Sequence, residues 1–431
     1  MELRLANRDV VRLWIIGGAN NMVRWLEILA AAVFVLEITG SGLAVAAVTA
    51  ARTLPLLLFG AIAGALGEAI DRKRIQALGM AITAATSATV SLLAWSGVIR
   101  PWHLAATGFV AGVVWSTDMS SRRRMVADAA PAGAVARVIA LDSLAGALTR
   151  MAGPIAGTAA YDAIGLRGAF ACSAALSLIN LLLLQKIHHT QPPHPLALAR
   201  LPRDLAEAFA AALALPPIRA VLGVTIVMNL FGFAYTALVA PIGLLVFAVP
   251  IAWIGALAAA EPLGSIIGGL ALAANLQLSP RRLLLGGAAL FAFMLGLMPM
   301  APSFPLACLA LLLGGIGLAG FSTMQTTIIL TAAPLALRSR MLGLITVCMG
   351  TGPFGLLLIG ALSDRAGPLA AVEIMSAASL TGLTLVGLSW INRDRAARQA
   401  AAPDAPPPTT AASTAQNTAP PPADRRSSAE T

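Results

Sequence analysis

The sequence predicts an all-α integral membrane protein with twelve transmembrane helices in two pseudo-symmetric bundles of six. Three observations predict this fold class: the composition, a series of apolar stretches separated by short basic loops, and an internal repeat. Of the 431 residues, 58% are hydrophobic and only 11% are charged, whereas a soluble globular domain carries about a quarter charged residues. Because a folded soluble chain needs polar surface, lipid is the expected solvent for most of this one.

The apolar stretches match the length of membrane-spanning helices, which need about 20 predominantly apolar residues. Their order divides the chain into two sets of six, separated by a central stretch that contains several prolines and histidines. The twelve candidate spans are residues 13–38, 43–67, 75–98, 103–120, 137–161, 168–187, 220–247, 252–276, 284–300, 305–331, 340–362 and 369–391.

The same pattern divides the chain into five segments. The tail is rich in Ala, Pro, Thr and Ser and has few hydrophobic residues, which is typical of disorder. The expected segments are a cytoplasmic N-terminus (1–12), an N-terminal six-helix bundle (13–187), a cytoplasmic central loop (188–219), a C-terminal six-helix bundle (220–391) and a disordered cytoplasmic tail (392–431).

The basic residues of the short loops fall mostly on one side of the predicted membrane. That side has clusters such as 72–74 and 122–124, whereas the opposite side has only Arg100, Arg167 and Arg365. Cytoplasmic loops carry an excess of lysine and arginine. We therefore expect a multi-pass protein of the cytoplasmic (inner) membrane with both termini in the cytoplasm. The net charge of +10 belongs to these scattered loops and does not indicate nucleic-acid binding.

The two halves of the chain repeat one another at a nearly constant offset of 202 to 204 residues. A duplicated six-helix unit is how many transporters build a central site with alternating access. Gly-Pro pairs also recur in the fifth span of each half. The matched positions are Gly60 and Gly64 with Gly264 and Gly268, Pro131 and Arg137 with Pro334 and Arg340, and Asp162 and Gly165 with Asp364 and Gly367.

Residues 64–74, GALGEAIDRKR, lie between the second and third spans. They resemble the loop 2–3 signature of the major facilitator superfamily, G-x-L-x-D-R-x-G-R-R/K. Glu68 takes the acidic position and Ala69 replaces the usual arginine, while Asp71 stands where glycine is commonest. The resemblance implies a cytoplasmic gating hairpin, and it assigns this role to Gly64, Glu68, Asp71, Arg72, Lys73 and Arg74.

The charges of this hairpin also lead to a hypothesis about gating. We expect Glu68 and Asp71 to pair with basic residues or helix N-termini of the other half and so to latch the outward-open state. Arg338 and Arg340 are the candidate partners.

A second motif lies in the fifth span, where Gly153, Pro154 and Gly157 are followed by Gly165-Leu-Arg-Gly-Ala-Phe170. It resembles the G-P-x-x-G-G and G-W-R-x-x-F pattern that many exporters of the superfamily carry, with Thr158 in place of the second glycine of the pair. The resemblance covers residues 10–392, and the opening spans resemble the drug and siderophore exporter branches. The equivalent segment of the second half includes Asp364, Arg365 and Gly367.

These motifs have two physical interpretations. Small residues four apart, such as Gly60 and Gly64, let helix backbones approach closely, which suits either a sliding contact or static packing. The Gly153-Pro154 pair removes a backbone hydrogen bond and softens its helix. That softness fits a gate helix, although kinks also occur in rigid bundles.

Charges within the apolar stretches are the strongest functional signal. A charge at the bilayer centre costs about 2.5–3.5 kcal/mol on insertion scales, so these side chains should face the bundle interior, a water-filled cavity or the interface. Arg24 and Glu27 are three residues apart and share a helix face, as do Asp142 and Arg150 two turns apart. The charged candidates are Arg24, Glu27, Arg52, Asp118, Asp142, Arg150 and Glu261.

Two roles remain open for these charges. In the first, Glu27 or Asp142 takes up a proton as the site alternates, and a nearby arginine tunes its proton affinity. In the second, the charges form fixed interhelical ion pairs. Asp118, near the cytoplasmic end of the fourth span, is expected to be a gating or structural charge. Polar side chains present the same choice between cavity lining and interhelical hydrogen bonds: Asn20, Asn21, Asn229 and Gln325.

The sequence therefore predicts a secondary transporter that exports a small, drug- or siderophore-like organic molecule in exchange for protons. The alternatives are a proton-coupled importer of a metabolite and, more remotely, a non-transporting membrane sensor or enzyme. We expect a monomer in the lipid bilayer, with no cofactor and no enzymatic activity. A Walker A loop is absent from the sequence, and histidines 188, 189 and 194 lack neighbouring carboxylates or cysteines, so no metal site is expected.

Overall fold

The structure is a computed structural model, and it describes residues 7–131, 133–189, 191, 201–274 and 279–400. Within these residues the chain is helical and forms no strand. It divides into two compact units, Met1–Trp390 and Ile391–Thr431. The candidate site and the contacts discussed below lie within the first unit, and so do the membrane-spanning helices apart from the end of the last one, which runs past Trp390.

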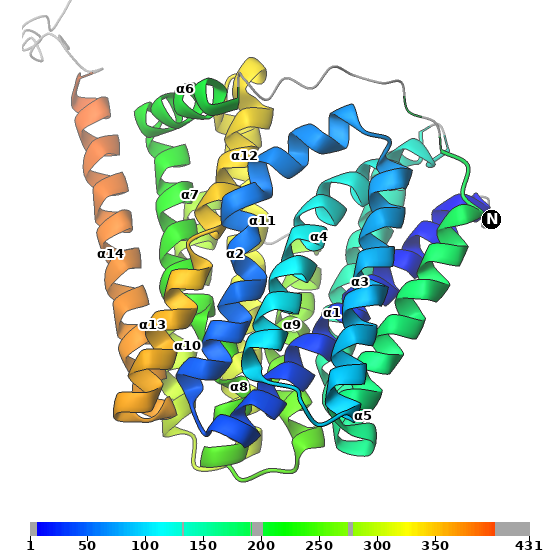
Figure 1. Cartoon of the computed structure of the whole chain (residues 1–431). Coiled ribbons are helices and arrows are strands. Elements are labelled where there is room, and N and C mark those ends of the chain that lie inside the picture. Colours follow the sequence, from blue (N-terminus) through cyan, green and yellow to red (C-terminus); the bar gives the residue numbers. More distant parts are fainter. Residues whose placement is uncertain (1–6, 132, 190, 192–200, 275–278, 401–431) are drawn as a thin grey trace, which may run out of the picture. The chain divides into compact units, whose positions relative to one another are not determined.

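Five long helices form the N-terminal half (Figure 1). The predicted spans at 137–161 and 168–187 both lie in α5, and the backbone between them breaks at Gly165, whose φ of 65° and ψ of −175° are not helical. Such a positive φ favours glycine. The helices are α1 (Arg8–Thr39), α2 (Gly42–Ala69), α3 (Arg72–Trp95), α4 (Pro101–Asp128) and α5 (Val135–Gln185).

The C-terminal half is less regular. The seventh predicted span, 220–247, is α7 (Pro216–Val227) followed by short π, 3₁₀ and α turns from Met228 to Val246, including α8 (Val239–Pro241). The eleventh, 340–362, is split into two helices between Met349 and Gly352. The remaining helices are α9 (Ile251–Ala273), α10 (Pro280–Leu297), α11 (Phe304–Ala332), α12 (Arg338–Met349), α13 (Gly352–Ala366) and α14 (Pro368–Ala400).

The predicted central loop contains a helix that the sequence analysis did not anticipate. Residues Leu201–Ala214 form α6, which packs against α7 and α12. Ala208 and Ala212 are four residues apart on one face and are fully buried, whereas Arg203 and Glu207 are exposed and paired at 2.9 Å. The apolar face was too short to register as a span, so hydropathy alone did not reveal this helix.

Nine stretches of the described residues are long and apolar enough to cross a membrane. One of them, Arg137–Gln185, covers two predicted spans. Helices α1 and α4 fall outside this set, and both carry charged residues such as Arg24 and Asp118. With α5 counted as two spans and these two helices added, the architecture is consistent with the twelve predicted spans.

The two halves meet most extensively along two helix pairs, α2 with α13 and α5 with α9, and less extensively where α2 contacts α12. In Figure 1, α2 and α13 run side by side. Glycines bring the backbones together: a Cβ placed on Gly255 of α9 would lie 2.6 Å from the Cα of Ile155 on α5. By contrast, Gly264 and Gly268 face α11 of their own half. Those two predicted sliding contacts therefore lie within one bundle, whereas Gly255 lies between bundles.

Candidate functional site

A cavity of about 770 Å³ lies between the two halves and is lined by both. Its volume suits a drug-sized molecule, since ligand pockets generally span 300–1,000 Å³. The irregular parts of the C-terminal half face it: Asn229, Phe233 and Tyr235 from the broken seventh span, and Met349 and Gly352 at the break of the eleventh. Transporters commonly place interrupted helices at the substrate site, where the freed backbone lines a cavity.

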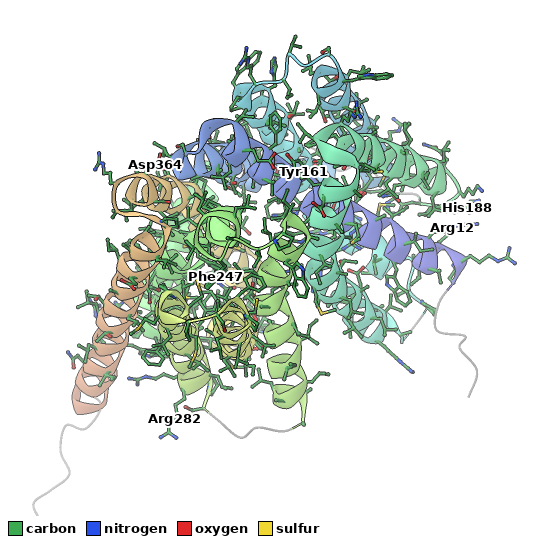
Figure 2. All side chains as sticks on the ribbon, turned by 90° about the horizontal axis from the view of Figure 1, so that it is seen from below. Arg12, Tyr161, His188, Phe247, Arg282 and Asp364 are labelled. Carbon is green, nitrogen blue, oxygen red and sulfur yellow. The ribbon has the colours of Figure 1, made fainter. Side chains whose placement is uncertain are left out.

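One end of the cavity is closed by the two helix pairs that join the halves. Asp364 at the end of α13 caps the N-terminus of α2: its carboxylate accepts hydrogen bonds from Gly42 N at 2.7 Å, Leu43 N at 3.2 Å and the Ser41 hydroxyl at 2.6 Å. On the second pair, the Thr158 hydroxyl of α5 donates to Ala252 O at 3.2 Å. Figure 2 shows this end of the molecule, with Asp364 labelled on it.

The lining extends away from this closed end. It reaches Trp14 and Gly17 near the start of α1 and Arg122 and Arg123 near the end of α4. These residues lie on the side that carries the basic loops.

The first of the acid–base groups is Glu27 of α1, which lies behind the cavity wall and pairs with Arg52 of the lining. Arg52 of α2 donates to its Oε2 at 2.9 Å, and the Ser87 hydroxyl of α3 donates to its Oε1 at 2.5 Å. Both carboxylate oxygens are therefore partnered, and the Glu27 residue is only 3% exposed. The carboxylate ties three helices of the N-terminal half together.

Arg24 was expected to share a helix face with Glu27, but it does not pair with it. Its guanidinium lies 3.6 Å from the centre of the Trp115 ring on α4. Such stacking is favourable because the ring face carries negative charge. Arg24 and Arg52 both line the cavity, and Trp115 is a partner that the sequence analysis did not identify, because ring contacts between distant helices leave no local pattern.

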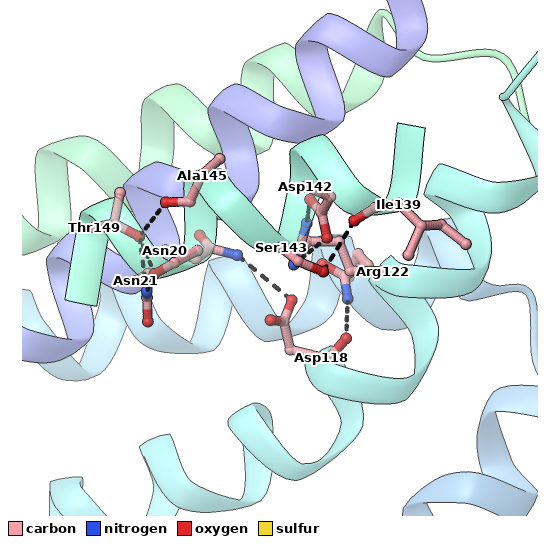
Figure 3. Close-up of polar contacts among 11 residues, drawn as sticks. Asn20, Asn21, Asp118, Arg122, Ile139, Asp142, Ser143, Ala145 and Thr149 are labelled. Carbon is pink, nitrogen blue, oxygen red and sulfur yellow. Dashed lines mark hydrogen bonds and ion pairs between the residues drawn. The ribbon is translucent and has the colours of Figure 1, made fainter. Parts of the chain in front are cut away.

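The acid of α5, Asp142, forms a two-pronged ion pair with Arg122 of α4, at 2.6 and 3.3 Å (Figure 3). The sequence pattern groups Asp142 with Arg150 on one helix face and places Arg122 in a cytoplasmic loop. The helix α4 instead continues past the predicted end at residue 120 to Asp128. This extension places Arg122 on the cavity wall. Nearby, Asp118 also lines the cavity, and it accepts a hydrogen bond from Asn20 at 3.5 Å.

Arg150 instead reaches across to the other half. It lies 3.5 Å from Glu261 of α9. The Glu261 side chain is 8% exposed and the Arg150 side chain 49% exposed. Among the described residues, Glu261 Oε1 has no hydrogen-bond partner. Of the ion pairs that line the cavity in the described part of the chain, this long contact is the one that joins the two halves.

The polar candidates line the cavity and also make hydrogen bonds. Gln325 of α11 donates to the Thr225 hydroxyl of α7 at 2.6 Å, and Asn21 of α1 donates to the Thr149 hydroxyl of α5 at 2.8 Å. Asn229 instead donates to Thr225 O, four residues earlier in the same span, at 2.9 Å. Gln325 and Asn21 therefore combine cavity lining with an interhelical hydrogen bond, whereas the hydrogen bond of Asn229 lies within its own span.

The basic end of the 64–74 hairpin is bound to its own half. Asp71 caps α3 by accepting from Arg74 N at 3.1 Å, Arg72 pairs with Asp128 at 3.0 Å, and Lys73 donates to Gln185 O and Ile187 O at 3.1 and 2.7 Å. The side chains of positions 64 and 68 lie outside the described residues. The latch of Glu68 and Asp71 with the other half therefore stays a prediction.

The motif of the fifth span packs against α1 beside Glu27. A Cβ on Gly157 would lie 2.9 Å from Leu26 Cα, and one on Gly153 the same distance from Trp25 Cβ. Pro154 lies within α5. In the second half, Arg365 occupies the last turn of α13, and Gly367, with a φ of 87°, ends it.

Comparison with known proteins gives one family and several relatives. The sequence matches the family described as "Transmembrane secretion effector" over residues 5–420. It is 28% identical over 364 residues to the "Multidrug efflux pump Tap" of Mycobacterium bovis and of Mycobacterium tuberculosis, covering 77% of this chain and 82% of each relative.

Solved structures of similar fold are transporters. A POT family transporter in complex with a thioalcohol-conjugated peptide superposes with a TM-score of 0.72 at 12% identity, covering 90% of this chain and 96% of the other. A bacterial homologue of the human lysosomal transporter Spinster superposes with a TM-score of 0.69 at 15% identity, with coverages of 90% and 96%. At these identities the likeness concerns the fold.

Proposed function

Because the chain belongs to the transmembrane secretion effector family of the major facilitator superfamily, we propose that it exports a small organic molecule by proton exchange and alternating access. As a member of that family it is a membrane transporter and not an enzyme. The expected setting is the cytoplasmic membrane, with both termini in the cytoplasm and a single chain as the functional unit.

The observation that carries this proposal is the cavity itself. It lies between two halves that are closed against each other at one end, and three of its arginines, Arg52, Arg122 and Arg150, each pair with a buried carboxylate. By the distribution of basic loops, the closed end is the outer one. The arrangement then corresponds to an inward-open state, ready to take cargo from the cytoplasm, and rocking the halves about the cavity would expose it outside.

Buried carboxylates paired with arginines of the cavity support protons as the coupling ion. Glu27, Asp142 and Glu261 are buried, and protonation of any of them would release its arginine from an ion pair. Charge rearrangements of this kind change the relative stability of two packed states, which is what coupling requires. We assign proton uptake to Glu27 and Asp142, with Arg52 and Arg122 as their partners.

The direction of transport rests on the relatives. The efflux pump that shares 28% identity with this chain over most of its length supports export. The glycine-proline motif of α5 supports the same direction through its resemblance to exporters. The cavity, which reaches the side of the basic loops, is compatible with loading from the cytoplasm.

The proposal is tested in inverted membrane vesicles with an acidic interior. A panel of fluorescent amphiphiles of both charge signs is offered from outside, which corresponds to the cytoplasm. We expect accumulation of at least one compound that collapses when a protonophore removes the gradient. Accumulation that persists without the gradient, or that occurs only when the gradient is reversed, would contradict proton-exchange export.

A further inference from the structure

The cavity has more positive than negative side chains. Five arginines and three acids line it: Arg24, Arg52, Arg122, Arg123 and Arg150 with Asp118, Asp142 and Glu261. When Glu27, which pairs with Arg52 from the adjoining wall, is included, the arginines still outnumber the acids. Walls of one sign concentrate ligands of the opposite sign, especially where the surroundings are apolar.

Among the described residues, two arginines of this set have no acidic partner within ion-pair distance, namely Arg24 and Arg123, and of these Arg123 is exposed. The guanidinium of Arg24 lies 3.6 Å from the centre of the Trp115 ring. Asp118 lines the same cavity, but it accepts a hydrogen bond from Asn20 at 3.5 Å. A guanidinium stacked on a ring keeps its edge free for hydrogen bonds, and that edge matches a carboxylate or sulfonate.

A second guanidinium of the cavity is only loosely held. Arg150 lines the same cavity as Arg24, and it contacts Glu261 at 3.5 Å with its side chain half exposed. An anion between these two arginines would be attracted by both charges. Aromatic side chains from both halves line the same cavity, namely Trp25, Trp115 and Phe233, and they offer ring faces for the rest of such a molecule.

We propose that the cargo is an aromatic organic anion whose carboxylate or sulfonate binds between Arg24 and Arg150, with its ring among the tryptophan side chains. This inference rests on the proposed transport function and specifies its substrate class. The loose contact between Arg150 and Glu261 gives the anion a direct effect on the halves, because it competes for the arginine that links them. Cargo binding would thereby weaken the cross-half ion pair from within the cavity.

The test is equilibrium binding to the full chain in nanodiscs of zwitterionic lipid. The three tritiated probes share one ring and differ in charge: 2-naphthoate, 2-naphthamide and 2-naphthylmethylammonium. We expect naphthoate to bind at least tenfold more tightly than the ammonium compound. Arg24→Gln should weaken naphthoate binding at least tenfold, Arg24→Lys should weaken it less, and neither should strengthen binding of the amide. Arg167→Gln, an exposed arginine of the opposite side, is the matched control.

The inference is overturned if the ammonium compound binds as tightly as naphthoate, if none of the three probes binds, or if Arg24→Gln leaves naphthoate affinity unchanged. The binding assay is independent of transport. If the protein binds naphthoate but transports no cargo when a proton gradient is imposed, this inference stands and the proposed function is contradicted. If a proton gradient drives export of cationic compounds only, the proposed function stands and this inference is contradicted.

Discussion

Arg150 of α5 and Glu261 of α9 face each other across the two halves at 3.5 Å, inside the cavity. Both line the space that cargo would occupy. A contact of this length is weaker than the 2.6 Å pair of Arg122 and Asp142 within the N-terminal half. The cavity thus combines firmly held charges within a half with a loosely held pair between halves, which suits an interface that must separate.

The first prediction concerns this pair. Glu261→Gln removes the charge that holds Arg150 across the interface while keeping the shape of the side chain. We expect transport driven by a proton gradient to fall at least tenfold, equivalent to about 1.4 kcal/mol in the rate-limiting step. Vesicle uptake at matched protein content measures it, and equal uptake by wild type and variant would rule out a role for this contact.

The second prediction concerns the Glu27–Arg52 pair and protein stability. Arg52→Gln leaves a buried carboxylate without its cation, which costs about 3–5 kcal/mol. We expect a clearly lower thermal unfolding temperature in detergent. Replacing both residues, Glu27→Gln with Arg52→Gln, removes the uncompensated charge and should recover most of the loss. If the double variant unfolds at a temperature no higher than that of the single variant, the unpaired charge is not the cause of the lost stability.

The third prediction concerns the cap that Asp364 places on α2. Losing a side-chain cap costs about 1 kcal/mol, which is about a fivefold change in an equilibrium. In Asp364→Ala we expect the closed end to open more often. With the native cysteines replaced, spin labels at Ile38 and Leu245, which are 49% and 61% exposed, should report longer distances.

Asp162 provides the matched control for that experiment, because it is the repeat counterpart of Asp364 and is exposed. Asp162→Ala should leave the distance distribution unchanged. If Asp364→Ala also leaves it unchanged, the cap does not contribute to closure of this end.

The fourth prediction concerns the close approach of α5 and α9. A methyl group on Gly255 would meet the Thr158 hydroxyl and lie 2.6 Å from Ile155 Cα. Overpacking of this kind typically costs about 1–3 kcal/mol. We expect Gly255→Ala to lengthen the same spin-label distance. Gly269 of the same helix has no neighbouring atom within 4 Å, so Gly269→Ala should behave as wild type. Identical behaviour of the two variants would contradict close packing as the basis of closure.

Much of the fold could be predicted from the sequence because lipid imposes a simple rule on helix length and loop charge. Most charged residues of the cavity could also be predicted, since charges in apolar spans must turn inward, but Arg122 and Arg123 could not. Nor could the partners of the predicted charges. Arg122 was assigned to a loop until α4 proved to extend to Asp128, and the stacking of Arg24 on Trp115 depends on how two distant helices pack.

The breaks in the seventh and eleventh spans were also not predicted. Hydropathy records the composition of a stretch and not the course of its backbone, so residues 228–246 register as part of one apolar span. The Gly-Pro pair at 352–353 was noticed as a repeat of the α5 motif. Its consequence, a helix end at the cavity wall, depends on the packing of α13 against α2.

The central claim is that the carboxylates paired with cavity arginines couple cargo movement to protons, and one measurement tests it most directly. In proteoliposomes, cargo uptake and internal pH are recorded together for wild type and for the double variant Glu27→Gln with Asp142→Asn. We expect wild type to exchange cargo for protons and the double variant to lose gradient-driven transport while still binding cargo. A double variant that transports cargo and protons like wild type would contradict the account.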